Sequence, residues 1–128
     1  MNNTAGVPKE ECEQQALFNW AKMREGKYPE LRLMFHIPNG GKRSITEATR
    51  FKAEGVKAGV PDIFLPVPRG GYHGLFIELK RTRGAHVSDN QKQWIEDLRK
   101  QGYLAVVRKG WVSASECIML YMEGGLRR

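Results

Sequence analysis

The chain has few cysteines and no long apolar run. Its 128 residues include only two cysteines, Cys12 and Cys117, and two cysteines this far apart are more often free thiols than a disulfide in an intracellular protein. No stretch approaches the roughly 18 consecutive apolar residues of a membrane span. The first residues lack the basic and apolar stretches of a secretory signal. We therefore expect a cytoplasmic protein with no membrane segment, in the host cytoplasm if the source is viral.

Repeats, low-complexity tracts and Ser/Gly-rich linkers are also missing, so we expect one domain spanning residues 1–128. What is abundant is positive charge. Lys and Arg number 21 against 14 Asp and Glu, which gives a net charge of +7 and a pI near 9.6. This balance favours a polyanionic partner such as nucleic acid. Basic surfaces also serve solubility, so charge alone does not identify the partner.

Glycine and proline residues divide the chain into eight predicted elements in the order αβαββαβα. The expected helices cover residues 9–24, 46–54, 89–101 and 113–123, and the expected strands cover residues 31–37, 62–65, 75–80 and 103–107. Capping boxes at 88–91 and 113–116 are predicted to begin the last two helices. A short turn joins the second and third strands, so these two strands should be antiparallel.

The predicted strand 75–80 carries a carboxylate and an ammonium group on one face. Strand side chains alternate between faces, so Glu78 and Lys80 lie together, opposite Leu79. Asp62 begins the preceding strand, where its carboxylate can approach that of Glu78. Burying such groups is unfavourable unless they pair with each other or bind a metal ion.

A divalent cation would relieve the repulsion between Asp62 and Glu78, because Mg²⁺ and Mn²⁺ prefer oxygen ligands. Such an ion polarises a phosphodiester and lowers the pKa of a bound water. Lys80 can orient that water and stabilise the developing negative charge. These residues together predict a nuclease that depends on Mg²⁺ or Mn²⁺.

Each half of this pattern also has an ordinary structural explanation. An aspartate after Pro61 at a strand entry is common turn chemistry, and Glu-x-Lys is often the solvated face of an edge strand. The combination favours a functional site, because a single predicted hairpin brings Asp62 and Glu78 onto neighbouring strands.

Five linked motifs run through nearly the whole chain. They are Glu11 with Gln15, residues 36–41 (HIPNGG), residues 55–62 (GVKAGVPD), residues 74–80 (GLFIELK), and Ser88 through Gln91 to Trp94. Together they resemble the VRR-NUC (virus-type replication-repair nuclease) family of the PD-(D/E)XK superfamily. The resemblance implies an α/β, restriction-endonuclease-like fold with a mixed central sheet flanked by helices. It also implies a divalent-metal nuclease that, in short stand-alone viral members, cuts branched DNA such as four-way (Holliday) junctions as a homodimer.

The resemblance assigns roles to individual residues. Asp62, Glu78 and Lys80 match the PD and (D/E)XK positions, with Asp62 and Glu78 as metal ligands. Gln91 matches the helix glutamine that follows them in this family.

A glutamate from the first helix is expected to complete the metal site. Glu10, Glu11 and Glu13 all fall in the first turns, and Glu11 is preferred because Gln15 lies one turn beyond it on the same face. Glu13 is the second choice. Favourable charge at a helix N-terminus is the alternative explanation for all three.

Several residues near the predicted site are candidates for DNA contacts, with solvated loops as the alternative explanation. They are Asn39, Lys42, Arg43, Arg81 and Arg83. His36 is expected to lie in the core or beside the metal ligands, because the three histidines show no zinc-ligand spacing.

Two other functions compete with this hypothesis. One is a catalytically silent, basic DNA-binding module whose carboxylates are structural, which would not need a metal ion. The other is a sequence-specific restriction-type endonuclease on the same fold, which the small size and the lack of an evident target-recognition insert disfavour.

Overall fold

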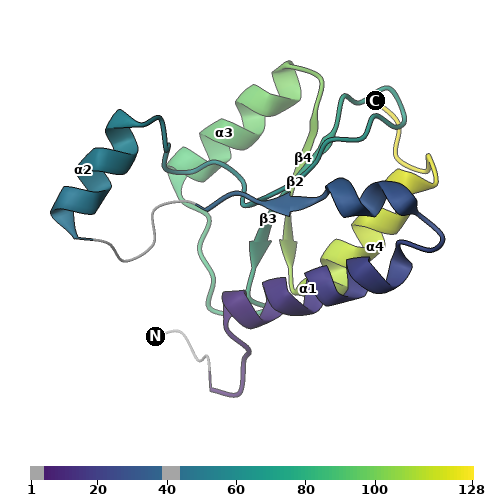
Figure 1. The fold of residues 1–128 in the computed structure, drawn as a ribbon, viewed down its shortest axis with the longest axis horizontal. Helices are drawn as coiled ribbons and strands as arrows, with labels where there is room; N and C mark the ends of the chain where they lie inside the picture. The colour runs from purple at the N-terminus through teal and green to yellow at the C-terminus, as the bar shows by residue number, and fades with distance from the viewer. Residues whose placement is uncertain (1–4, 39–43) are drawn as a thin grey trace.

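The computed structural model describes residues 5–38 and 44–128. Four helices and a four-stranded sheet follow one another in the predicted order (Figure 1). The elements are α1 (Glu10–Arg24), the 3-10 helix η1 (Pro29–Leu33), β1 (Phe35–His36), α2 (Ile45–Ala53), β2 (Ile63–Leu65), β3 (Leu75–Lys80), α3 (Asp89–Lys100), β4 (Leu104–Lys109) and α4 (Trp111–Met122).

The sheet is mixed and its strand order is β1-β2-β3-β4. Strands β1, β2 and β3 pair antiparallel, as expected for the last two, and β4 runs parallel to β3. Helix α3 makes the connection that a parallel pair needs. All six residues of β3 are buried, so the strand that carries Glu78 and Lys80 lies inside the molecule rather than at an edge.

The two faces of β3 meet different surroundings. Leu75, Ile77 and Leu79 pack with buried side chains of α1 and α4, including Leu17 and Ile118, in the larger hydrophobic cluster. These helices lie together beneath the sheet in the view of Figure 1.

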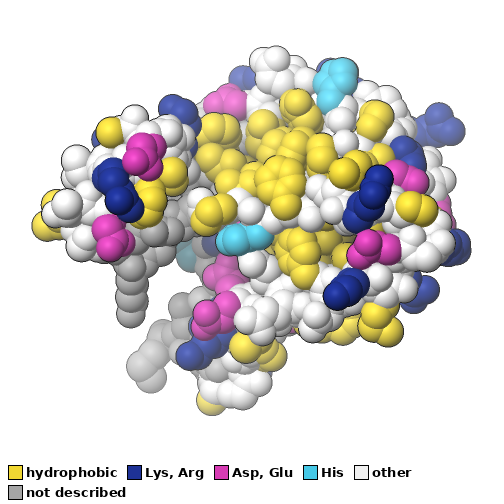
Figure 2. All heavy atoms as spheres, viewed as in Figure 1, with side chains coloured by type: hydrophobic (Ala, Val, Ile, Leu, Met, Phe, Trp, Pro, Cys, Tyr) yellow, Lys and Arg dark blue, Asp and Glu magenta, His cyan; other side chains and the backbone are white. Residues whose placement is uncertain are grey.

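On the other face, Phe76 packs with Ile95 of α3 and Ala105 of β4 in a cluster of only three buried residues. Phe64 and Tyr103 are only partly buried there. Figure 2 shows hydrophobic side chains gathered at the surface in the middle of the face viewed there. Helix α3 therefore covers this face of the sheet less completely than α1 and α4 cover the other.

Helix α2 stands apart from the sheet and from the other helices (Figure 1). The Ser44 hydroxyl accepts a hydrogen bond from the Glu47 amide and begins this helix as an N-cap. None of its residues is buried, so tertiary packing contributes little to its stability.

The expected strand over residues 31–37 was wrong in its first half. Residues Pro29–Leu33 form a 3-10 helix, and only Phe35–His36 pair with the sheet. Pro29 favours a helical start because its fixed φ suits the first turn. The Met34 amide then bonds to the Leu31 carbonyl and closes the last turn.

The second predicted capping box was also wrong, whereas the first, formed by Ser88 and Gln91, is confirmed. Helix α4 begins at Trp111, two residues before Ser113. The Trp111 amide donates to Glu13 Oε1 of α1. A carboxylate that is distant in sequence thus satisfies this helix start, and a local motif cannot reveal such a partner.

Both cysteines are free, Cys12 exposed and Cys117 buried. None of the helices in the described part of the chain has both the length and the apolar character needed to span a bilayer.

Candidate active site

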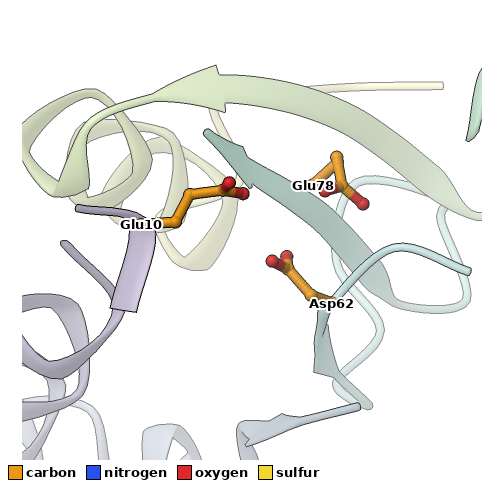
Figure 3. A group of neighbouring side chains, drawn as sticks. All are labelled: Glu10, Asp62 and Glu78. Carbon is orange, nitrogen blue, oxygen red and sulfur yellow. The ribbon is translucent and has the colours of Figure 1, made fainter. Parts of the chain in front are cut away.

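Three carboxylates from three elements converge beside β3 (Figure 3). Glu10 is the first residue of α1, Asp62 immediately precedes β2, and Glu78 lies within β3. One oxygen of each lies within 4.8 Å of the others. Like charges at this separation repel strongly in a partly buried site. A neutralising cation or bound protons must therefore accompany the group.

Hydrogen bonds from the sheet hold Asp62 in place. Its Oδ1 accepts from the Leu79 amide at 2.9 Å. Its backbone carbonyl accepts from the Ile37 amide at 2.7 Å and lies 2.9 Å from His36 Nδ1. These contacts tie Asp62 to β3 on one side and to the end of β1 on the other, so its carboxylate has a defined position.

Glu78 is buried, with 2% of its surface exposed. Its Oε2 lies 3.5 Å from Lys80 Nζ. Its Oε1 is buried and, within the described residues, has no hydrogen-bond partner. Buried carboxylate oxygens nearly always have a partner, so the unpartnered Oε1 points to a missing ligand.

The local environment disfavours negative charge on these carboxylates. Burial, followed by the nearby Asp62, raises the pKa of Glu78 from 4.5 to about 8. Burial, reinforced by Glu10 and opposed by the Leu79 amide, raises the pKa of Asp62 from 3.8 to about 6. A bound divalent cation would reverse this balance, because it favours the ionised carboxylates.

Lys80 is connected to helix α3 through Gln91. Lys80 Nζ donates to Gln91 Oε1 at 3.2 Å, and the same oxygen accepts from the Ser88 amide at 2.9 Å. The second bond belongs to the capping box that begins α3. The helix start therefore fixes Gln91, and Gln91 in turn helps to place the ammonium group of Lys80 beside Glu78.

The chemistry of the cluster fits a hard divalent cation such as Mg²⁺ or Mn²⁺. All three candidate ligands, Glu10, Asp62 and Glu78, supply oxygen atoms, which these ions prefer. Glu78 Oε1, which has no partner among the described residues, would gain one. Bound there, the ion would polarise a phosphate and lower the pKa of a water ligand.

The first-helix glutamate at the cluster is Glu10, not the preferred Glu11. Glu11 is exposed and belongs to no potential metal-ligand group among the residues that the structure describes. Glu13, the second choice, is buried and accepts the Trp111 amide instead. The sequence did contain a signal: Glu10 lies seven residues, about two turns, before buried Leu17 and so faces the same side of α1.

The proposed DNA contacts are only partly described. Arg83 is exposed, as a phosphate contact requires. Arg81 is partly buried, and its Nη2 donates to the Val7 carbonyl at 3.4 Å, while its buried Nε has no partner among the described residues. Asn39, Lys42 and Arg43 lie outside the described residues.

Sequence reasoning placed His36 only in part. Gln14 follows Glu10 by one helical turn, and both Gln14 and Gln15 line a hollow with His36. His36 is exposed rather than in the core, and its ring contacts the backbone of Asp62. The contact places His36 beside a candidate metal ligand.

Comparisons with known proteins agree with the motifs. The VRR-NUC domain family matches residues 7–111. A solved structure described as a VRR_NUC domain protein superposes with a TM-score of 0.81 at 37% sequence identity, over 94% of this chain and 93% of that chain. No curated protein matches the chain. With a family match over most of its length and a solved relative of the same fold, the chain belongs to the VRR-NUC family of nuclease domains.

Proposed function

We propose that this protein is an endodeoxyribonuclease that depends on Mg²⁺ or Mn²⁺ and cuts branched DNA. One observation carries the proposal: within the described part of the chain, Glu78 Oε1 is buried without a partner in a group of three carboxylates. A carboxylate group built only for stability would have its oxygens hydrogen-bonded. A group that holds a cation would leave oxygens free for it.

Glu10, Asp62 and Glu78 hold the cation in this proposal. The Leu79 amide orients Asp62, and the sheet fixes Glu78. When bound, the cation polarises the scissile phosphate and acidifies a water. Lys80, held by Gln91 within reach of Glu78, positions that water and stabilises the negative charge that develops on the phosphate.

DNA binding in this proposal rests on the net charge of +7 and on cations near the site, including exposed Arg83. Contacts of this kind recognise phosphates rather than bases. Selectivity would then come from the shape of a branch rather than from sequence.

We further propose that the working unit is a homodimer, because resolving a four-way junction takes two symmetric cuts. Each chain brings one three-carboxylate group in its described residues. Exposed apolar side chains near β1 support a subunit contact there: Leu33 and Phe35 are each 47% exposed. Light scattering at working concentration should show dimers, and paired cuts by a strictly monomeric enzyme would contradict this part of the proposal.

The direct test is a cleavage assay on linear, flap and four-way DNA with Mg²⁺, with Mn²⁺ and with a chelator. We expect metal-dependent cutting of branched DNA in preference to linear duplex. Glu78→Gln serves as the inactive control, since it removes the charge and keeps the shape. Equal cutting by Glu78→Gln, or cutting without metal, would contradict the proposal.

A basic DNA-binding module without catalysis is the competing function. Such a module would bind DNA equally with and without divalent metal. Its affinity would also not change when Asp62 or Glu78 is replaced.

A further inference from the structure

A hollow of about 250 Å³ lies between α1 and β1, and one of its lining residues, His36, contacts the backbone of Asp62. Its lining residues are Gln14, Gln15 and Phe18 of α1 and His36 of β1. Among the described residues, none of those that line the hollow is a lysine or arginine. Its lining is an aromatic side chain, two amides and an imidazole.

Helix α1 carries residues of both the hollow and the candidate active site. Glu10, Gln14 and Phe18 are four residues apart in turn, so they form one stripe on the same side of the helix. The stripe begins with a carboxylate of the metal group, continues with an amide and ends with an aromatic ring. Each helical turn advances about 5.4 Å, so the hollow begins about one turn from the carboxylates.

His36 joins the hollow to the metal group from the other side. Its Nδ1 lies 2.9 Å from the carbonyl oxygen of Asp62. A carbonyl oxygen only accepts hydrogen bonds, so Nδ1 is the donor in this contact. The hollow therefore has a held imidazole at His36, with the amides of Gln14 and Gln15 able both to donate and to accept.

We propose that this hollow receives an unpaired nucleobase of the DNA strand, next to the phosphate that is cut. A base offers a flat face for Phe18 and polar edges for the amides and imidazole, the combination by which proteins hold single-stranded nucleic acid. This inference rests on the proposed nuclease function.

The base must be unpaired because a paired base within duplex DNA has its faces stacked and its edges engaged. Branch points and flaps present bases that can leave the stack at low energetic cost. The pocket thus gives the active site a direct way to prefer branched DNA over linear duplex, independent of phosphate contacts.

The test is a thermodynamic cycle in which the Phe18 ring of the protein and the bases of the DNA arm are removed separately and together. The DNA is a flap whose single-stranded arm carries either normal nucleotides or abasic sites throughout, so the phosphates stay the same. The protein is wild type or Phe18→Leu, which keeps an apolar side chain against the core but loses the flat ring. Binding is measured by fluorescence anisotropy in Ca²⁺, chosen to occupy the metal site without supporting efficient cutting.

For wild type, we expect the abasic arm to bind about 5-fold to 150-fold more weakly, the range for loss of one base–aromatic stack. Phe18→Leu should weaken binding of the normal arm to a similar degree. With Phe18→Leu, removing the bases should then have little further effect. Equal weakening by base removal in both proteins, or in neither, would overturn the inference.

Matched variants separate this pocket from changes in folding. Thermal unfolding shows whether Phe18→Leu folds, and if it does not, Gln14→Ala replaces it in the same cycle. Gln93→Ala, which removes an exposed glutamine of α3, is the control and should behave as wild type with both arms.

The outcome also separates this inference from the proposed function. If the normal flap is cut in a metal-dependent way but binding does not depend on the bases, the base pocket is rejected and the nuclease function is supported. If binding depends on the bases and on Phe18 but no DNA is cut, the base pocket is supported and the nuclease function is rejected.

Discussion

The two faces of strand β3 differ in what they contribute to the protein. On one face, Leu75, Ile77 and Leu79 are each only 1% exposed and join the larger core with α1 and α4. On the other, Glu78 and Lys80 are also buried, at 2% and 7% exposure, but they are charged groups beside a cluster of only three buried apolar residues.

This difference separates stability from function within one strand. The apolar face buries hydrocarbon, which stabilises the fold. The charged face buries a carboxylate whose surroundings raise its pKa to about 8, which opposes folding once the group is ionised. Such a residue is expected where a protein needs a ligand site. The stabilisation from packing on the opposite face offsets the unfavourable free energy of burying the carboxylate.

The largest expected effect is on catalysis. Glu78→Gln should reduce the cleavage rate by roughly 10³-fold or more, because it removes a proposed metal ligand. The measurement is the single-turnover rate on branched DNA in Mg²⁺, after contaminating nucleases have been excluded. Near-normal cleavage by the purified variant would show that Glu78 is not part of the active site.

The neighbouring residue on the opposite face should show the reverse behaviour. Leu79→Ala should lower the free energy of unfolding by about 2–5 kcal/mol, because it leaves a cavity in the larger core. Glu78→Gln should leave that free energy unchanged or raise it in metal-free protein. Urea denaturation in a chelator measures both, and a greater loss of stability in Glu78→Gln than in Leu79→Ala would reverse the assignment of the two faces.

The pH dependence of stability sharpens the same comparison. Folding raises the pKa of Glu78 from 4.5 to about 8 and that of Asp62 from 3.8 to about 6. The folded, metal-free protein therefore holds more protons than the unfolded chain in this range. The resulting stabilisation is full below the unfolded pKa values and is lost as pH rises through the folded ones.

The urea concentration at the unfolding midpoint, measured in a chelator, should accordingly decrease as pH is raised from 6 to 8. In this range Asp62 loses its proton first and Glu78 loses its own last. Glu78→Gln should flatten this slope, and Mg²⁺ should oppose it by favouring the ionised carboxylates. An unchanged slope in the variant would show that Glu78 does not carry the extra proton.

The smallest expected effect concerns an exposed positive charge that lies on neither face of β3. Arg83→Ala should reduce the slope of log affinity against log salt concentration by about one phosphate contact, without changing the metal requirement. Binding in Ca²⁺ across a salt series measures it. If the slope stays the same, Arg83 does not contact DNA.

Local sequence patterns predicted most of the fold. Strand alternation placed Glu78 and Lys80 on one face, and the capping box at Ser88 identified the start of α3. These features depend on residues that are close in sequence. The start of α4 did not, because its partner is Glu13, far away in the chain.

The same distinction explains the candidate site. Asp62 and Glu78 could be paired from sequence because one hairpin joins their strands. The choice among the α1 glutamates depended on how that helix is rotated against the sheet. Each residue along a helix turns it by about 100°, so moving from Glu10 to Glu11 changes the face that the carboxylate occupies.

The most direct test of the proposed metal site compares these two adjacent glutamates. Isothermal titration calorimetry with Mn²⁺ should be run on wild type, Glu10→Gln and Glu11→Gln at neutral pH in buffers of different ionisation enthalpy. We predict that Glu10→Gln weakens Mn²⁺ binding by more than about tenfold, that Glu11→Gln binds as wild type, and that wild type releases protons on binding. Equal binding by all three proteins, or a loss confined to Glu11→Gln, would contradict a metal site formed by Glu10, Asp62 and Glu78.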